Sequence, residues 1–250
     1  LINNGANFTR SRTVTLALSA SDITSGISQM RFSLDDGSTW TAWEAFISTK
    51  MLDLTSGDGP KEVRYQLIDR AGLVSSIYSD TIILDTTPPT LTVSSPLPFS
   101  TVSEQGFTIQ GAVSDVHAQV SSVRLYVYDY GRSAYTVINQ PAVYNPGAGT
   151  WSFQVLPSHI TEGKPAIFFV RAEDTAGNRT GWRSTQVTVR DVTPPVGSIL
   201  INNSEPFTNV TSATLHLSAT DAGSGINKMR FSSDGVNWTA QPNVAAPRAG

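Results

Sequence analysis

The opening segment of the chain recurs near its end, and this repeat constrains the fold more than any other feature. Residues 2–33 align with residues 201–232 without a gap, and both copies contain Asp-x-x-x-Gly-Ile followed by Met-Arg-Phe-Ser. An internal repeat indicates one supersecondary unit used more than once. The sequence therefore predicts an array of similar units. Because the last copy breaks off about halfway, we expect the chain to be a window on a longer protein.

Two similar Pro-Pro segments divide the chain. Asp85-Thr86-Thr87-Pro88-Pro89 and Asp191-Val192-Thr193-Pro194-Pro195 begin at a spacing that suits one β-sandwich of about 100 residues. A Pro-Pro pair cannot continue a ladder or a helix, and it stiffens the junction. We therefore predict three units, which are 1–88 with a clipped first strand, a divergent unit at 89–194, and 195–250 as the N-terminal half of a unit that repeats 1–50.

Short alternating segments dominate each unit. In residues 13–18 the apolar side chains Val14, Leu16 and Leu18 occupy every second position, which is typical of a half-buried strand. Strands are predicted at 1–4, 13–20, 27–33, 40–47, 50–54, 62–68 and 77–84, at 90–95, 106–114, 122–129, 135–144, 150–156, 165–172 and 184–190, and at 197–202, 212–219, 226–232 and 238–241. Seven short strands per unit predict an all-β chain of tandem immunoglobulin-like β-sandwiches joined by short Pro-Pro linkers.

Bulk composition excludes several classes of partner. The formal net charge is −3 and the charges are scattered, so no basic footprint for nucleic acid is present. No apolar run is long enough to span a bilayer, so we expect no membrane insertion. The chain has no cysteine, which either a reducing compartment or a bacterial exterior permits. Abundant Thr, Ser, Asn and Gly with little Lys favour an extracellular or cell-surface location.

Several motifs together resemble one family of modules. They are LSASDITSGI and LSATDAGSGI, the MRFS…DG…W segments, EDTAGN, and the DTTPP and DVTPP linkers. The chain is similar over its whole length to the bacterial Ig-like modules that occur in tandem in large secreted and surface proteins. The resemblance implies an Ig-like fold and a bacterial surface or secreted context. Such modules occur in adhesins, in stalks and beside catalytic domains, so it does not fix one function.

Acidic loop residues are the sharpest functional lead. In an Ig-type sandwich the B–C and F–G loops gather at one end, where we expect the linker to enter. Asp85 should then meet Asp115, Glu173 and Asp174, and Asp191 should meet Asp221. Within the first unit, Asp22 and Asp69 occupy the corresponding loops. Carboxylates from three segments would suit Ca²⁺ at the domain junctions. The alternative is that each aspartate caps its own turn. No other cofactor is expected.

Aromatic residues offer a second candidate site. Ser33–Trp40 matches the S-x-D-x-G-x-T-W pattern of the Asp box known from sialidase propellers, and we interpret it as a hairpin device rather than a glycosidase element. Trp43, replaced by Gln241 in the third copy, is the better candidate for an exposed ring. Tyr128 and Tyr130 belong to an aromatic cluster that could bind a glycan or protein, although aromatic residues in sandwiches mostly serve packing.

The three histidines lie outside any hydrolytic motif, and no paired carboxylates are set up for acid–base chemistry, so we predict no enzyme activity. The leading hypothesis is a non-catalytic structural or adhesive array that acts as a semi-rigid spacer or display rod. One alternative is an accessory stalk or carbohydrate-binding region of a large secreted enzyme. Another is a filament subunit in which a neighbouring copy completes the half unit by strand complementation. Expected partners are neighbouring domains of the same chain, other copies, or a surface glycan or protein.

Overall fold

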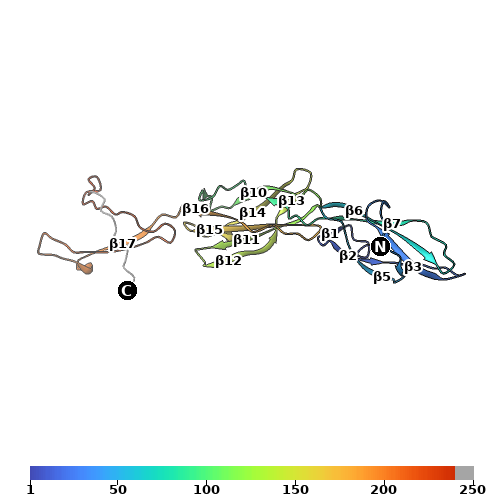
Figure 1. The fold of residues 1–250 in the computed structure, drawn as a ribbon. Coiled ribbons are helices and arrows are strands. Elements are labelled where there is room, and N and C mark those ends of the chain that lie inside the picture. Colours follow the sequence, from blue (N-terminus) through green and yellow to red (C-terminus); the bar gives the residue numbers. More distant parts are fainter. Residues whose placement is uncertain (240–250) are drawn as a thin grey trace.

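The computed structural model describes residues 1–239 and shows two β-sandwiches and a two-stranded sheet arranged end to end (Figure 1). The first sandwich contains β1 (Phe8–Thr9), β2 (Thr13–Ala17), β3 (Ile27–Ser33), β4 (Glu44–Ala45), β5 (Thr49–Asp53), β6 (Gly59–Asp69) and β7 (Tyr78–Leu84). A five-stranded sheet of order β1-β7-β6-β3-β4 faces a pair formed by β2 and β5. The fold is all-β, as the alternating pattern predicts.

The second sandwich is larger. It contains β8 (Thr90–Leu91), β9 (Thr101–Val102), β10 (Phe107–Ser114), β11 (Val120–Asp129), β12 (Ala134–Pro141), β13 (Val143–Asn145), β14 (Thr150–Val155), the 3₁₀ turn η1 (Pro157–His159), β15 (Pro165–Asp174) and β16 (Arg183–Val189). Its sheets have the orders β13-β14-β10-β8 and β12-β11-β15-β16-β9. This is the strand arrangement of an immunoglobulin-like sandwich, in which the first strand is divided between the two sheets.

The divided first strand appears in both sandwiches. In the second, β8 pairs antiparallel with β10, and the chain then crosses so that β9 pairs parallel with β16. In the first, Ile2 forms a bridge with Leu16, and β1 then pairs parallel with β7. The loops at one end of each sandwich are thereby placed beside the point where the chain enters it.

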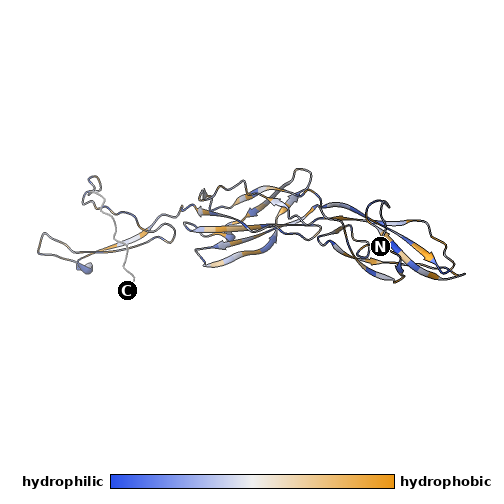
Figure 2. Cartoon of the chain, viewed as in Figure 1, coloured by the Kyte–Doolittle hydropathy of each residue, from blue (hydrophilic) through white to orange (hydrophobic). Residues whose placement is uncertain are grey.

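Each sandwich has its own apolar core, built by alternation along the strands. Every second residue of β15 is buried, and the hydropathy colours alternate along these strands (Figure 2). Trp151 is 1% exposed, and its indole N–H donates to the Thr92 carbonyl at 3.0 Å. Gly111 lies beneath that contact, where a Cβ would fall 1.9 Å from the Thr92 oxygen. Only a residue without a side chain fits there.

Some predicted strands have different limits. The strand expected at 1–4 is reduced to the bridge at Ile2, because Asn3, Asn4 and Gly5 all have positive φ and turn the chain. The segment expected at 40–47 pairs only at β4, and that at 90–95 pairs at β8 and at an isolated bridge between Ser95 and Gln110. The two-residue strands β1 and β9 were not predicted, since two residues show no periodicity.

The third region pairs β17 (Val196–Ile201) with β18 (Leu215–Thr220) around the 3₁₀ turn η2 (Asn202–Ser204). All residues of both strands are exposed. Of the strand predicted at 226–232, only an isolated bridge at Lys228 is present. Its counterpart β3 pairs with β4 and β6, and between Asp221 and Thr239 the structure has no strand that could flank it. Of the strand predicted at 238–241, residues 238 and 239 are not in a strand, and 240–241 lie outside the described residues.

Among residues 1–239 no helix is long and apolar enough to cross a membrane.

Candidate functional site at the first junction

The linker between the two sandwiches is fixed from its first residue. Asp85 follows β7, and its backbone N–H donates to the Thr9 carbonyl at 2.8 Å, which ties it to the first sandwich. Its side chain is completely buried, and its Oδ1 accepts from the Thr87 backbone N–H at 3.0 Å. Pro89, just before β8, is also buried. The junction is therefore a packed element rather than a free tether.

A second carboxylate holds the linker from the side. Asp58 accepts hydrogen bonds from the Thr86 backbone N–H at 3.0 Å, the Thr86 hydroxyl at 2.9 Å and the Thr87 hydroxyl at 2.7 Å. These hydrogen bonds, first that of the Thr87 hydroxyl, hold the pKa of Asp58 below its usual value. Asp58 precedes Gly59, whose φ of 116° lets the chain turn directly into β6. We call this arrangement the linker clamp.

Three carboxylates meet where the linker reaches the second sandwich. Asp85 comes from the linker, Asp115 follows β10, and Asp174 ends β15. One oxygen from each lies within 4.8 Å of the other two. The structure thus brings together the three segments that loop placement indicated, and we call these residues the acidic triad.

The triad oxygens differ in how they are satisfied. Asp174 accepts the backbone N–H of Asn178 at 2.9 Å and its side-chain amide at 3.0 Å. Asp115 Oδ1 accepts the N–H groups of His117 at 3.0 Å and Ala118 at 2.9 Å. Asp85 Oδ2 is buried and has no hydrogen-bond partner. Turn capping therefore accounts for Asp115 and Asp174 but leaves Asp85 Oδ2 unexplained.

The electrostatics of the triad are unfavourable. Within residues 1–239 no lysine or arginine forms an ion pair with any of its members. Burial raises the pKa of Asp85, and the neighbouring carboxylates of Asp115, Asp174 and Asp58 raise it further. His117 also approaches Asp58 and Asp85, and its Nδ1 is buried without a partner.

Glu173 does not join the triad. Adjacent residues on a strand point to opposite faces, so Glu173 faces outward where Asp174 faces the junction. Its carboxylate instead pairs with Arg179, with Nε and Oε2 3.1 Å apart. The expectation that Glu173 shares the site is wrong for this reason.

The second junction repeats the linker clamp with different geometry. Glu162 accepts the backbone N–H of Thr193 at 2.7 Å and its hydroxyl at 2.9 Å, as Asp58 does for its own linker. Asp191 is only half-buried, and it accepts the backbone N–H groups of Thr193 and Ser224. Asp221 lines the same pocket but caps Gly225 of its own loop at 2.8 Å. These acidic residues cap backbone groups and form no cluster like the triad.

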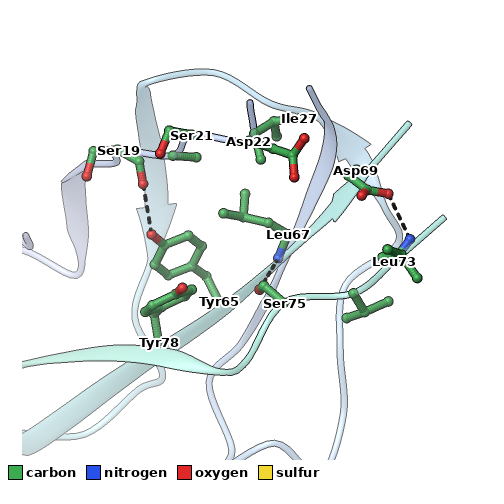
Figure 3. A pocket seen from close by; sticks show the side chains of 12 residues that line it. Ser19, Ser21, Asp22, Ile27, Tyr65, Leu67, Asp69, Leu73, Ser75 and Tyr78 are labelled. Atoms are coloured by element: carbon green, nitrogen blue, oxygen red, sulfur yellow. Dashed lines mark hydrogen bonds between the residues drawn. The ribbon is translucent and has the colours of Figure 1, made fainter. Parts of the chain in front are cut away.

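At the opposite end of the first sandwich, Asp22 and Asp69 line an open pocket (Figure 3). The Ser25 hydroxyl links them, 3.3 Å from Asp22 Oδ1 and 2.9 Å from Asp69 Oδ2. Asp22 also accepts three backbone N–H groups of its loop, and Asp69 Oδ1 accepts that of Leu73 at 2.8 Å. Here too the carboxylates cap their own turns.

The Asp-box segment is a hairpin, as interpreted from its sequence. Asp35 accepts the Thr39 backbone N–H at 2.9 Å and the Ser33 hydroxyl at 2.8 Å, and the Trp40 indole donates to the Gly37 carbonyl at 3.1 Å. The Thr39 hydroxyl also donates to Asp35, and this hydrogen bond, followed by those of the Thr39 backbone N–H and the Ser33 hydroxyl, lowers the pKa of Asp35 to about 2.

The aromatic candidates lie in two places. Trp43 is half-buried, and the Arg31 guanidinium lies 4.5 Å from its ring centroid and 4.7 Å from that of Trp40. One face of Trp43 is therefore occupied, contrary to its expected exposure. The rings of Tyr128, on β11, and Tyr130, just after β11, lie edge to face with their centroids 5.2 Å apart.

The aromatic surface extends beyond the tyrosine cluster that the sequence indicated. A hollow beside Tyr128 is lined by Tyr126, Tyr135, Ile138, Phe169 and Trp182, and we call it the aromatic hollow. Arg171 lies over the Trp182 ring at 4.5 Å. Sequence reasoning missed Phe169, and the signal for it was its outward phase on β15, where it pairs with Tyr126 of β11.

Asp58 and Asn178 were also missed at the junction. Asn178 is buried, and its side-chain amide bridges the Asp85 carbonyl at 2.8 Å and Asp174 Oδ2 at 3.0 Å. A signal for Asp58 exists, because an acidic residue followed by glycine precedes β6 at Asp58 and β15 at Glu162.

No family model matches the chain, and no curated protein matches it either. Among solved structures, it is similar to the fibronectin(III)-like modules of Clostridium thermocellum CbhA, with 14% identity, a TM-score of 0.41, and coverage of 76% of this chain and 94% of that one. Domains FN1–FN3 of chicken CNTN1 give 14% identity, a TM-score of 0.31, and coverage of 78% and 68%. An engineered protein gives 20% identity, a TM-score of 0.32, and coverage of 44% and 22%.

Proposed function

We propose that the chain is a non-catalytic spacer whose β-sandwiches are held in fixed relative positions by clamped linkers. The observation that carries this proposal is the repetition of the clamp. Asp58 and Glu162 occupy equivalent turns and accept hydrogen bonds from equivalent linker threonines. A flexible tether would not need the same side-chain contacts at successive junctions.

Direct contacts across each junction support a spacer role. At the first, the Arg10 guanidinium donates to the Gly177 carbonyl of the second sandwich at 3.1 Å. At the second, the Lys164 ammonium donates to the Gly223 carbonyl at 2.8 Å, and Gly163 lies so close to Gly223 that a Cβ would meet its backbone at 2.4 Å. Each unit therefore touches the next beyond the linker itself.

The setting we propose is a bacterial surface or secreted protein, in which the array positions neighbouring domains. Abundant Ser, Thr, Asn and Gly and the absence of cysteine support this setting. A non-catalytic role is supported by the histidines. His159 stacks on Phe153, and burial lowers its pKa, while His216 lies on an exposed strand.

The spacer proposal is tested by a distance measurement between the sandwiches. Because the chain has no cysteine, spin labels at Met51→Cys and Val143→Cys, both exposed positions, report without background. Double electron–electron resonance should give one narrow distribution of distances between the two labels. Asp58→Ala should broaden it, whereas Glu44→Ala, which removes an ion pair remote from the linker, should leave it unchanged. A broad distribution in the unmodified background would refute the spacer.

A second candidate function, binding of an acidic carbohydrate, is favoured by the aromatic hollow. Sugars stack on exposed aromatic rings, and Trp182 is 45% exposed. Arg124 and Arg171 stand directly opposite each other on β11 and β15, and neither forms an ion pair within residues 1–239. Opposed like charges are unfavourable unless an anion lies between them, so a sugar carboxylate would complement this face.

Immobilised oligosaccharides with and without uronic acids test this second function on the full chain. Binding should require the uronic acid and should be lost in Trp182→Ala. Trp43→Ala is the matched control, because that ring also stacks on an arginine but lies in the other sandwich. Equal retention of neutral and acidic sugars, or no retention, would exclude an acidic-sugar site.

A further inference from the structure

We propose that the acidic triad of Asp85, Asp115 and Asp174 binds one Ca²⁺ ion, and that this ion stiffens the first junction. The inference rests on the proposed spacer function and adds a means of regulating it. Its starting point is the buried Asp85 Oδ2, which has no hydrogen-bond partner although the carboxylates of Asp115 and Asp174 lie beside that of Asp85.

Another buried carboxylate shows that the fold normally satisfies such groups. Asp129 is as completely buried as Asp85, yet its carboxylate accepts the backbone N–H and hydroxyl of Thr161 and the backbone N–H of Arg132, and it lies 3.4 Å from the Arg132 guanidinium. A buried charge without such partners is costly. Asp85 has two further carboxylates beside it instead, and a bound cation would satisfy all three.

The spacing of the oxygens fits calcium. Ca²⁺ binds oxygen ligands at roughly 2.4 Å, so two ligands of one ion are at most about 4.8 Å apart. The triad oxygens lie within 4.8 Å of one another, so no pair of them is too far apart to share one Ca²⁺ ion.

Zinc is the competing occupant. The neighbouring group of Asp58, Asp85 and His117 places an imidazole nitrogen among carboxylate oxygens, a donor set that suits Zn²⁺. Asp85, with its unpartnered oxygen, belongs to both groups, and the unpartnered His117 Nδ1 belongs only to the second. Calcium is favoured because all three donors of the triad are carboxylate oxygens, which are the ligands of a hard cation, and because the Asp58 carboxylate already accepts the hydroxyls of Thr86 and Thr87.

The ligands come from both sides of the junction, which gives the ion a mechanical effect. Asp85 is tied to the first sandwich through its N–H bond to Thr9, while Asp115 and Asp174 belong to loops of the second sandwich. An ion shared by them would cross-link the two sandwiches, and its removal would leave three like charges repelling one another.

Calorimetric titration of CaCl₂ into the full chain tests this proposal. We expect one saturable site per chain, with affinity reduced about tenfold or more in both Asp85→Asn and Asp115→Asn. Because Asp115 is half-exposed, Asp115→Asn still tests the site if Asp85→Asn, at a buried position, does not fold. Asp191→Asn, the equivalent residue of the second junction, is the control and should bind Ca²⁺ with unchanged affinity.

The proposal is overturned by the absence of saturable Ca²⁺ binding at millimolar concentrations, or by equal affinity in the triad variants. Binding of ZnCl₂ that depends on His117, without binding of CaCl₂, would also overturn it. A different result would contradict the spacer proposal. A broad distance distribution across the first junction in both Ca²⁺ and chelator would reject the spacer, whereas a narrow distribution without Ca²⁺ binding would reject only the ion.

Discussion

The two junctions begin with equivalent aspartates that end in different environments. Asp85 is completely buried, with one oxygen unpartnered among other carboxylates. Asp191 is half-buried, and its carboxylate accepts the backbone N–H groups of Thr193 and Ser224. The same linker residue therefore acts as a turn cap at one junction and as part of a buried acidic cluster at the other. Its role depends on which loops meet it.

At the second junction, none of the described acidic residues takes the place that Asp174 has at the first. After Asp221, the chain contains one further acidic residue, Asp234, whose carboxylate is held within the repeated hairpin by Ser232 and Asn237. Within residues 1–239, Asp191 therefore meets one acidic loop, whereas Asp85 meets two. This difference predicts that cations and charge-removing substitutions act on the first junction and not on the second.

The largest effect is expected from Asn178→Ala. The buried amide joins the Asp85 carbonyl to Asp174, and its loss leaves buried acceptors unsatisfied at a cost of about 1–3 kcal/mol. Hydrogen exchange of β15 amides would measure the change. Asn145→Ala, at an exposed turn, serves as the control. Equal effects of the two substitutions would mean that Asn178 has no special place in the junction.

In the presence of chelator, Asp85→Asn and Asp191→Asn should change the free energy of unfolding in opposite directions. The first relieves like-charge repulsion and gives the unpartnered position a donor, so it should stabilise the second sandwich by about 1 kcal/mol. The second weakens the hydrogen bonds that lower the pKa of Asp191, first among them that of Ser224, and should destabilise slightly. Urea unfolding of both variants checks the signs. Destabilisation by Asp85→Asn in chelator would contradict the account of the triad.

The linker clamps should act locally and alike. Asp58→Ala should broaden the distance distribution across the first junction only, and Glu162→Ala that across the second only, because each loses the threonine contacts of its own linker. Spin labels placed across each junction in turn would measure both. Transmission of either effect to the other junction would show that the units are not independent.

The smallest effect concerns Asp35, a fully hydrogen-bonded carboxylate that serves as a reference for the triad. Because its folded pKa is lowered to about 2, its contribution to stability is complete above the unfolded pKa of about 3.9 and is lost as pH falls through about 2. Carboxyl ¹³C shifts followed against pH should show this titration. A midpoint near 3.9 would mean that the hairpin bonds do not persist in solution.

Much of the fold could be predicted because alternation is a local signal. The segments around β2, β10 and β15 show period-two burial, and the strands formed where predicted. The segment 226–232 has only a bridge at Lys228, although its sequence repeats β3. The strand β3 itself pairs with β4 and β6, so its formation depends on partners elsewhere in the sheet. Periodicity describes a segment, whereas pairing depends on the whole sheet.

The site was predictable where topology determines it. The loops that carry Asp115 and Asp174 must meet the entering linker in an Ig-like sandwich, so their approach to Asp85 followed from strand order. Asp58 and Asn178 could not be assigned in that way, because their roles depend on individual hydrogen bonds to the linker. Glu173 precedes Asp174 by one residue on β15, so its side chain lies on the opposite face of the strand from the triad.

The most direct test of the account compares the two junctions in one experiment. Spin-label pairs at Met51→Cys with Val143→Cys and at Val143→Cys with His216→Cys, all exposed positions, would report on the first and second junctions respectively. Each distance distribution would be recorded in Ca²⁺ and in excess chelator. The account predicts that chelator broadens the first distribution and leaves the second unchanged. An equal response of both junctions, or no response of the first, would contradict it.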